Sequence, residues 1–182
     1  MKSQVFLISG PPGAGKSTLA KSIATLFDKS IHIECDYLYN MVQGGYKKPW
    51  EDGADKLFAL MYRTLASQAA IYAQAGFTVT ADYVWSPSEL YSIAQKIGQD
   101  PIIHPIFLLP EKAVNLKRDQ NREYVVGSDK VEKYWDEFFQ WKDTFPKIFH
   151  DNSLTAPDDL AKKLVQHKGY SNRELGILLE RK

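Results

Sequence analysis

A glycine-rich loop between a short apolar run and an amphipathic segment is the feature that most constrains this chain. Residues 5–8 (VFLI) are apolar, too few for a helix and followed by a turn, which is typical of a buried strand. Residues 10–18 read GPPGAGKST, and apolar residues at helical spacing follow as far as Leu26. The pattern G-x-x-x-x-G-K-[ST] between a strand and a helix indicates a phosphate-binding loop, or P-loop.

The residue types in this loop suit phosphate for separate reasons. Glycines let successive backbone N–H groups turn inward, and the helix that follows directs its positive end at the same point. The Lys16 ammonium can reach the β- and γ-phosphates of a nucleotide, and the Ser17 hydroxyl can bind Mg²⁺. A glycine turn without a ligand would have no need of Lys16. The predicted nucleotide-binding residues are Gly10, Pro11, Pro12, Gly13, Ala14, Gly15, Lys16, Ser17 and Thr18.

The composition is that of one globular domain spanning residues 1–182. Hydrophobic residues make up 44% of the chain and charged residues 25%, which are ordinary values. The net charge of +1 gives no electrostatic reason to expect a nucleic-acid or membrane partner. The single cysteine, Cys35, excludes an intramolecular disulfide, and no apolar run approaches the length of a membrane span. We therefore expect a cytoplasmic protein, with monomer and homodimer both open.

Strand-like runs alternate with helical periodicity along the chain. Strands are expected at residues 5–8, 30–35, 77–84, 102–109 and 147–150. Helices are expected at 19–26, 37–42, 56–75, 86–97, from 111, around 134–141, at 155–166 and at 171–180. This alternation predicts an α/β fold with a parallel sheet and right-handed crossovers. Pro105, within the fourth strand, predicts either an edge position or a pause in the ladder.

Ligands of such sheets bind beyond the carboxyl ends of the strands, where the P-loop, Asp36, Asp82 and the segment after Leu109 are all expected to meet. Phosphoryl transfer needs a group that orients the acceptor, and Asp36 is our candidate. At the end of the second strand it can accept the proton of an acceptor hydroxyl or hold a metal-bound water. The other interpretation is that Asp36 caps the helix that begins at Tyr37, and the two roles can coexist.

Asp82 ends the third predicted strand, the position of a Walker-B acid. There it can bind the metal together with Ser17. A carboxylate in an Asx turn at the end of a strand explains the same residue equally well, and substrate binding is a third role. The sequence leaves these roles open.

Arginine is scarce in this chain, with only five occurrences, and its planar fork binds phosphate well. Arg118 and Arg122 are four residues apart, so they share a helix face. They adjoin a polar stretch at residues 119–130 that we expect to close as a lid. We predict that both arginines act in catalysis, by stabilising charge on the transferred phosphoryl group and on the adenine side of the nucleotide. The alternative is a solvated face paired locally with Asp119 and Glu123.

Three further residues are candidates for substrate binding alongside Asp36 and Asp82. Arg63 lies within a long predicted helix and can either reach an anionic substrate group or extend into solvent. Trp50 and Tyr83 belong to a set of aromatic residues near the predicted strand ends. Most of that set would pack in the core or at its rim, and we expect these two to line the acceptor pocket.

These residues resemble the small P-loop kinases that act on metabolites, a group that includes gluconate kinase, shikimate kinase and chloramphenicol phosphotransferase. Residues 10–18 are common to the group. The segment from Asp36 through Asn40 and Gly44 to Trp50 is most similar to gluconate kinase. Residues 118–122 (RDQNR) are similar to the lid arginine segment of such kinases, and residues 151–157 (DNSLTAP) to their nucleotide-base loop.

The resemblance implies a P-loop NTPase three-layer sandwich, with a five-stranded parallel sheet in the order 2-3-1-4-5 and a small lid. It also implies ATP and Mg²⁺ as cofactors and an acceptor hydroxyl that is activated near Asp36. Residues 46–48 (YKK) stand where gluconate kinases carry an Asp-x-Asp-Arg stretch. The acceptor is therefore a small alcohol for which a sugar acid such as gluconate and a drug of the chloramphenicol type are both candidates.

Other classes of nucleotide-binding protein fit less well. A GTPase would carry Asn-Lys-x-Asp and Asp-x-x-Gly motifs after the P-loop, and the sequence has neither. A motor or AAA-type ATPase is disfavoured by the length and by the lack of paired acids at a strand end. A nucleic-acid kinase would need a basic groove. A non-catalytic ATP-binding regulatory protein is the alternative from another class.

Overall fold

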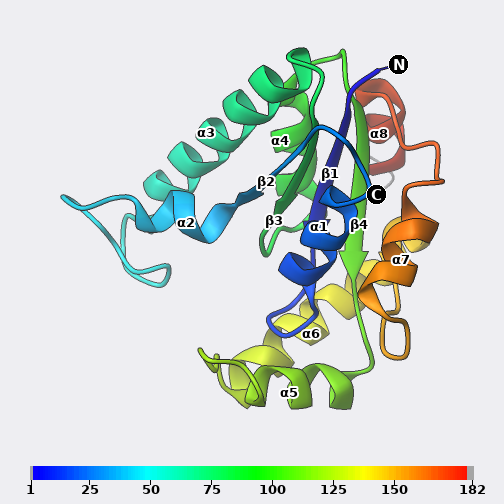
Figure 1. The fold of residues 1–182 in the computed structure, drawn as a ribbon. Helices are drawn as coiled ribbons and strands as arrows, with labels where there is room; N and C mark the ends of the chain where they lie inside the picture. Colours follow the sequence, from blue (N-terminus) through cyan, green and yellow to red (C-terminus); the bar gives the residue numbers. More distant parts are fainter. Residues whose placement is uncertain (1, 180–182) are drawn as a thin grey trace.

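The computed structural model of the protein describes residues 2–179 and is built on a parallel β-sheet (Figure 1). The strands are β1 (Gln4–Ser9), β2 (Ser30–Glu34), β3 (Thr78–Asp82), β4 (Ile102–Leu108) and β5 (Phe149–His150). Their spatial order is β2-β3-β1-β4-β5, and every neighbouring pair is parallel. The α/β class and the strand order that the family resemblance implies are therefore confirmed.

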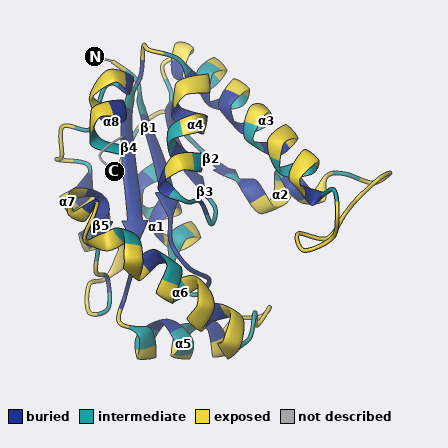
Figure 2. Ribbon diagram, turned by 180° about the vertical axis from the view of Figure 1, so that it is seen from behind, coloured by how far each residue is buried: buried dark blue, intermediate teal, exposed yellow. Residues whose placement is uncertain are grey.

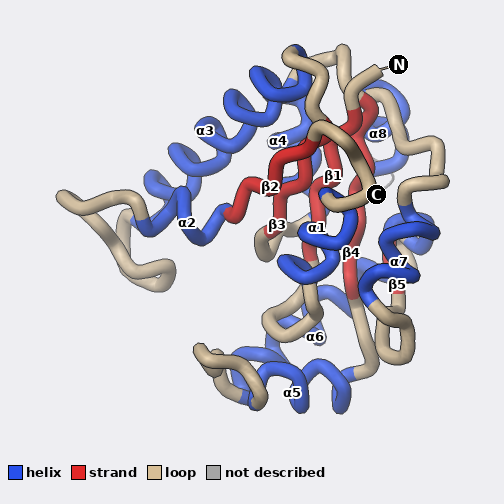
Figure 3. The backbone as a smooth tube through the Cα atoms, in the orientation of Figure 1, coloured by secondary structure: helices blue, strands red, loops and turns tan. Residues whose placement is uncertain are grey.

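Helices cover both faces of this sheet (Figure 3). They are α1 (Lys16–Ala24), α2 (Cys35–Asn40), α3 (Ala54–Gln74), α4 (Pro87–Ile97), α5 (Lys112–Gln120), α6 (Ser128–Lys142), α7 (Pro157–Leu164) and α8 (Asn172–Leu179), with a 3₁₀ turn at Pro146–Ile148. Helices α1 and α7 pack on one face, and α3, α4 and α8 pack on the other. The result is the three-layer arrangement expected from the alternating pattern.

The central strand β1 explains why the first apolar run is continuous. Phe6 and Ile8 pack against α1 and α7, whereas Val5 and Leu7 point into the core on the other face. All four side chains are completely buried, as the buried sheet at the centre of Figure 2 illustrates. A strand covered on both faces needs apolar residues at every position. Its carboxyl end is thereby held firmly where the P-loop begins.

Pro105 lies at an interruption of the hydrogen-bond ladder along β4, and β4 is not an edge strand. Strand β4 lies between β1 and β5, but β5 pairs only with Phe107 and Leu108. On that same outer side, Ile103 donates its backbone N–H to Tyr170. Backbone N–H groups alternate along a strand, so Pro105 falls in the gap between these two contacts, where a missing N–H breaks no ladder bond.

The start of α2 corrects the expected position of Asp36. Strand β2 ends at Glu34, which is also the N-cap residue of α2, and the helix begins at Cys35. Asp36 lies in the first turn of the helix, so the interpretation of Asp36 as its cap is wrong. A carboxylate in this turn still gains from the positive end of the helix.

Other helix ends show how far capping signals can be trusted. The reciprocal capping box between Ser86 and Glu89 opens α4 as expected, and Ser171 and Glu174 form the same pair of bonds before α8. Helix α7, in contrast, has Ala156 as its N-cap, and this residue offers no side-chain hydrogen bond. Residue 180, predicted to end the last helix, lies outside the described residues.

The stretch predicted as a lid runs from the end of α5 through a turn into α6. The Asp119 carboxylate accepts hydrogen bonds from the backbone N–H groups of Val126 and Gly127, at 3.1 Å each. This buried acid ties the far end of the turn back to α5. Its closing over a ligand stays a prediction. Within residues 2–179, no helix is long and apolar enough to cross a membrane.

Two histidines, the buried His104 and the half-buried His150, predict that the fold weakens in acid. His104 of β4 stacks on Phe6 with ring centroids 4.2 Å apart. Burial, with a smaller contribution from the nearby His167, lowers the pKa of both His104 and His150 from 6.5 to about 4. Below pH 6.5 the unfolded chain therefore binds protons that the folded protein excludes, so stability falls as the pH decreases toward 4.

We expect the variant His104→Gln to lose less stability than the wild type when the pH is lowered from 7 to 4.5. The difference should be about 2 kcal/mol, because one shifted histidine no longer contributes. Urea unfolding monitored by circular dichroism at each pH measures it. The variant His167→Gln, at an exposed site, should keep most of the acid sensitivity. Equal acid sensitivity in wild type and His104→Gln would contradict this account.

Candidate active site

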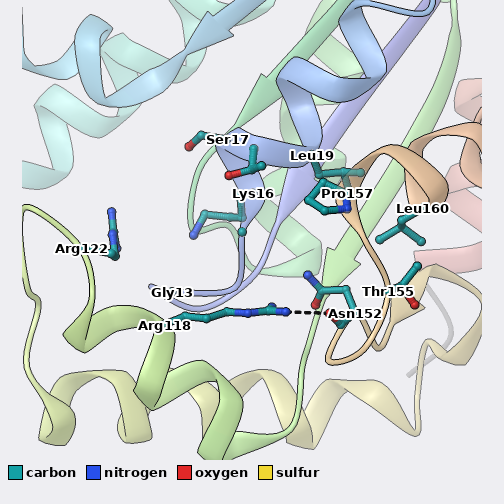
Figure 4. Close-up of a pocket in the computed structure, with 12 residues that line it drawn as sticks. Gly13, Lys16, Ser17, Leu19, Arg118, Arg122, Asn152, Thr155, Pro157 and Leu160 are labelled. Atoms are coloured by element: carbon teal, nitrogen blue, oxygen red, sulfur yellow. Dashed lines mark hydrogen bonds between the residues drawn. The ribbon is translucent and has the colours of Figure 1, made fainter.

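The P-loop between β1 and α1 adopts a backbone that its glycines require. Gly13 and Gly15 have φ angles of 83° and 91°, in the left-handed region. A methyl group on Gly13 would lie 2.7 Å from the Asn115 carbonyl oxygen, so this glycine is also needed for close packing against α5. The loop leads directly into α1 at Lys16, which directs the helix N-terminus into a cavity (Figure 4).

Two buried asparagines hold the loop in this shape. Asn115 of α5 donates its side-chain amide to the Pro12 carbonyl at 2.7 Å. Asn152, in the connection between β5 and α7, donates to the Ala14 carbonyl at 2.8 Å. The loop is therefore fixed without a ligand, which reduces the ordering cost of binding one. Asn115 was not among the predicted residues, because nothing in a local helical pattern marks an asparagine that reaches another segment.

Lys16 is a half-buried ammonium beside the loop. Its Nζ donates to the Pro11 carbonyl at 3.1 Å. Burial, with a smaller contribution from the charge of Arg122, lowers the pKa of Lys16 from 10.5 to about 8, although Asp82 and Asp36 act to raise it. A cation at the N-terminus of a helix, beside a glycine-rich loop, fits a bound polyphosphate.

Ser17 and Asp82 form the group that could hold Mg²⁺. The Ser17 hydroxyl donates to Asp82 Oδ2 at 2.7 Å, which joins the first turn of α1 to the end of β3. Hydroxyl and carboxylate oxygens are the ligands Mg²⁺ prefers, so this pair fits the ion. The other oxygen, Asp82 Oδ1, lies 2.7 Å from Nε2 of His32 on β2. Asp82 is itself almost fully buried.

His32 is a site residue that the search for functional side chains missed. A screen for histidines at metal-ligand spacing from one another does not select it. The signal was available in the strand period, because His32 and Glu34 share the face of β2 that lies beside Asp82 on β3. This pattern identifies His32 as a partner of Asp82 only once β2 and β3 are known to be neighbours.

Asp36 shares the electrostatic environment of the P-loop. Burial raises the pKa of its carboxyl group, and Asp82 raises it further, whereas the positive charges of Lys16 and Arg122 lower it. The described structure thus brings Lys16, Asp36, Asp82 and Arg122 within mutual electrostatic range. This is the convergence at the carboxyl ends of the strands that the sequence predicts.

Arg118 and Arg122 both line the cavity of about 420 Å³ beside the P-loop, but they differ in their partners. Arg118 Nη2 donates to the backbone carbonyls of Asn152 at 2.9 Å and Ser153 at 3.2 Å. Arg122 is half exposed, and its Nη1 lies 3.5 Å from Asp119 Oδ1. Figure 4 shows Arg118 extended toward Asn152, whereas Arg122 lies on the opposite side, toward Lys16. That both arginines act in catalysis stays a prediction, and their different partners indicate two different roles.

The remaining candidates for substrate binding separate into near and distant groups. Tyr83 follows β3, and burial and the charge of Asp36 both raise its pKa, so it belongs to the site. Trp50 is 71% exposed and contacts Lys130 of α6, whose Nζ lies 4.7 Å from the ring centroid. Arg63 is exposed on α3, with no ion pair among the described residues. The structure does not bring Arg63 to the cavity.

Solved structures share this fold at low sequence identity. The tunicamycin resistance protein of Deinococcus radiodurans superposes with a TM-score of 0.65 at 16% identity, over 90% of this chain and 94% of that one. The shikimate kinase of Acinetobacter baumannii gives 0.61 at 19% identity, over 90% and 91%. A gluconokinase from Sinorhizobium meliloti 1021 gives 0.57 at 16% identity, over 99% and 93%. At these identities the likeness establishes the fold, that of the P-loop NTPases.

No curated protein matches the sequence at a significant level. A protein-family profile does match it, over residues 5–143, and the description of that family is AAA domain. Those residues include the P-loop, β1 to β4 and both cavity arginines. The match concerns the domain and leaves untested our expectation against an AAA-type ATPase activity. Because it covers most of the chain, the protein belongs to the AAA-domain family.

Proposed function

We propose that this protein is an ATP-dependent kinase that transfers the γ-phosphoryl group of Mg-ATP to a hydroxyl of a small molecule. One observation carries the proposal: the Asp36 carboxylate lies in the combined field of Lys16 and Arg122 beside the P-loop. A protein that only binds ATP needs the loop and Lys16, but it does not need a carboxylate within electrostatic range of both Lys16 and Arg122. The kinase fold of the solved neighbours supports the same conclusion.

Each side chain has a defined part in this reaction. Asp36 accepts the proton of the acceptor hydroxyl, whose oxygen attacks the γ-phosphorus. The bond from that phosphorus to the β–γ bridging oxygen breaks, and ADP leaves with the electron pair. Lys16 and Arg122 stabilise the charge that develops on the transferred group. Ser17 and Asp82 would hold Mg²⁺, which when bound neutralises charge on the phosphate oxygens.

Tyrosine hydroxyls and cations both contribute to the surroundings of Asp36. Tyr83 lies within electrostatic range of Asp36, Tyr39 and Tyr134, and Lys16 and Arg122 act on Asp36 itself. Phenol hydroxyls suit the neutral hydroxyl groups of an alcohol, whereas a sugar acid would want an arginine or lysine for its carboxylate. Arg63, the cation predicted for that role, is exposed on α3. A drug-like or other neutral alcohol is thus a second candidate beside gluconate.

A screen of ATP consumption with and without added alcohols tests the proposed function. The panel pairs sugar acids, including gluconate, with neutral alcohols such as shikimate-type esters, nucleosides and chloramphenicol. We expect acceptor-dependent ADP release that the variant Lys16→Met abolishes. ATP binding without acceptor-dependent turnover by any member of the panel would favour the regulatory alternative.

The variant Asp36→Asn should separate chemistry from binding. We expect kcat for transfer to fall by roughly 10² to 10⁴, because the amide cannot accept the hydroxyl proton. Affinity for the analogue AMP-PNP, measured by isothermal titration calorimetry, should stay within about threefold. The control Asp100→Asn alters an exposed acid just before β4, at the opposite end of the strands from the P-loop, and should change neither quantity. Transfer that survives in Asp36→Asn would show that Asp36 is not the base.

The two cavity arginines should respond differently to truncation. Arg122→Ala should reduce kcat on the order of 10³-fold with little change in AMP-PNP affinity, because its guanidinium acts on charge that develops during transfer. Arg118→Ala should lower affinity and kcat/KM by a similar factor, since Arg118 holds the Asn152–Ser153 backbone that supports the loop. Steady-state kinetics and calorimetry on both variants measure this. An equal loss of affinity and rate in Arg122→Ala would make Arg122 a binding residue.

A further inference from the structure

A closed circuit of polar contacts ties α1 to the two strands beside it. Ser17 Oγ donates to Asp82 Oδ2 at 2.7 Å, and Asp82 Oδ1 lies 2.7 Å from His32 Nε2. His32 Nδ1 lies 3.7 Å from Glu34 Oε1, which in turn pairs with Lys21 Nζ at 2.7 Å. Ser17 and Lys21 are one helical turn apart on α1, so the circuit begins and ends on the same helix face.

The buried half of this circuit is the half that contains the predicted metal ligand. The side chains of His32 and Asp82 are only 11% and 6% exposed, whereas that of Lys21 is 62% exposed. A carboxylate oxygen accepts hydrogen bonds, so Nε2 is the donor in the contact between His32 and Asp82 Oδ1. Without His32, Oδ1 would be a buried acceptor with no donor, which costs free energy and leaves the carboxylate free to turn.

We propose that His32 is a positioning residue for the metal site: by holding Asp82 Oδ1, it fixes the carboxylate plane so that Oδ2 stays directed at Ser17 and the metal. This rests on the proposed function, because it assumes that Mg²⁺ accompanies the nucleotide between Ser17 and Asp82. Partners of this kind orient a metal ligand without touching the ion, and losing one typically costs about 10- to 100-fold in metal affinity.

The test is the gain in AMP-PNP affinity that Mg²⁺ confers, measured by calorimetry with excess Mg²⁺ and again with EDTA. His32→Ala should reduce the gain by about 10-fold or more while leaving affinity in EDTA nearly unchanged. Mn²⁺ affinity of the AMP-PNP complex, followed by electron paramagnetic resonance, should fall by a similar factor. Both readouts are independent of the acceptor and of turnover.

Isosteric variants separate positioning from simple packing. The amide nitrogen of His32→Gln can take the place of Nε2 and should keep the metal gain within about threefold of wild type. The shorter amide of His32→Asn takes the place of Nδ1, so it should behave like alanine. These two variants also decide the question if His32→Ala fails to fold. His104→Gln, which alters a buried histidine on the same sheet face away from Asp82, should leave the gain unchanged.

A metal gain that persists in His32→Ala, or that is lost equally in His32→Gln and His32→Asn, would overturn the positioning role. Loss of affinity in EDTA to the same extent as in Mg²⁺ would also overturn it, because the defect would then lie in the loop. Failure of the proposed function is distinguishable, since the wild-type protein would then bind no AMP-PNP or transfer no phosphoryl group. A wild type that binds AMP-PNP with no metal gain would overturn the inference alone.

Discussion

The half-buried ammonium of Lys16 is the charge around which the other groups of the site are arranged. Burial is the main cause of the lowered pKa of Lys16, which is about 8; the charge of Arg122 also lowers this pKa, whereas Asp82 and Asp36 raise it. The backbone around Lys16 is fixed by Asn115 and Asn152. A polyphosphate suits this arrangement, since its negative charge would meet Lys16 and Arg122 beside the N-terminus of α1.

The need to hold opposite charges at fixed distances explains why the site uses the centre of the sheet. Ser17 comes from α1, Asp82 from β3 and His32 from β2, and the Asp82–His32 contact crosses the parallel pair β2 and β3. Asp82 is at the end of a strand whose residues are all buried. The arginines, in contrast, lie on α5 and the turn that follows it, where Arg122 is half exposed. The group that could hold the metal is therefore anchored on the sheet, whereas Arg122 belongs to a more exposed segment.

Much of this arrangement can be predicted from the sequence, because it depends on local patterns. The rest depends on contacts between distant segments. The P-loop and the end of β3 were predictable because a strand followed by GPPGAGKST, and an apolar strand ending in Asp82, are local patterns. The order of strands followed from the family resemblance. His32 and Asn115 were missed because each acts on a residue more than 45 positions away, and only the register of neighbouring strands or helices reveals such pairs. Arg63 was selected for its residue type, but the position of a side chain around a helix depends on which face packs.

The acceptor side of the site could also be predicted only in part from the sequence. Asp36 could be placed beside the P-loop from its position after β2, yet its exact location in the first turn of α2 required the structure. The charged groups that act on it come from α1, from the end of β3 and from the turn after α5, so three separate elements decide its chemistry. Trp50 contacts Lys130 of α6, so the connection before α3 lies beside the helix that follows this turn. Contacts of this kind join segments that are far apart in the sequence, and for this reason no local pattern predicts the acceptor pocket.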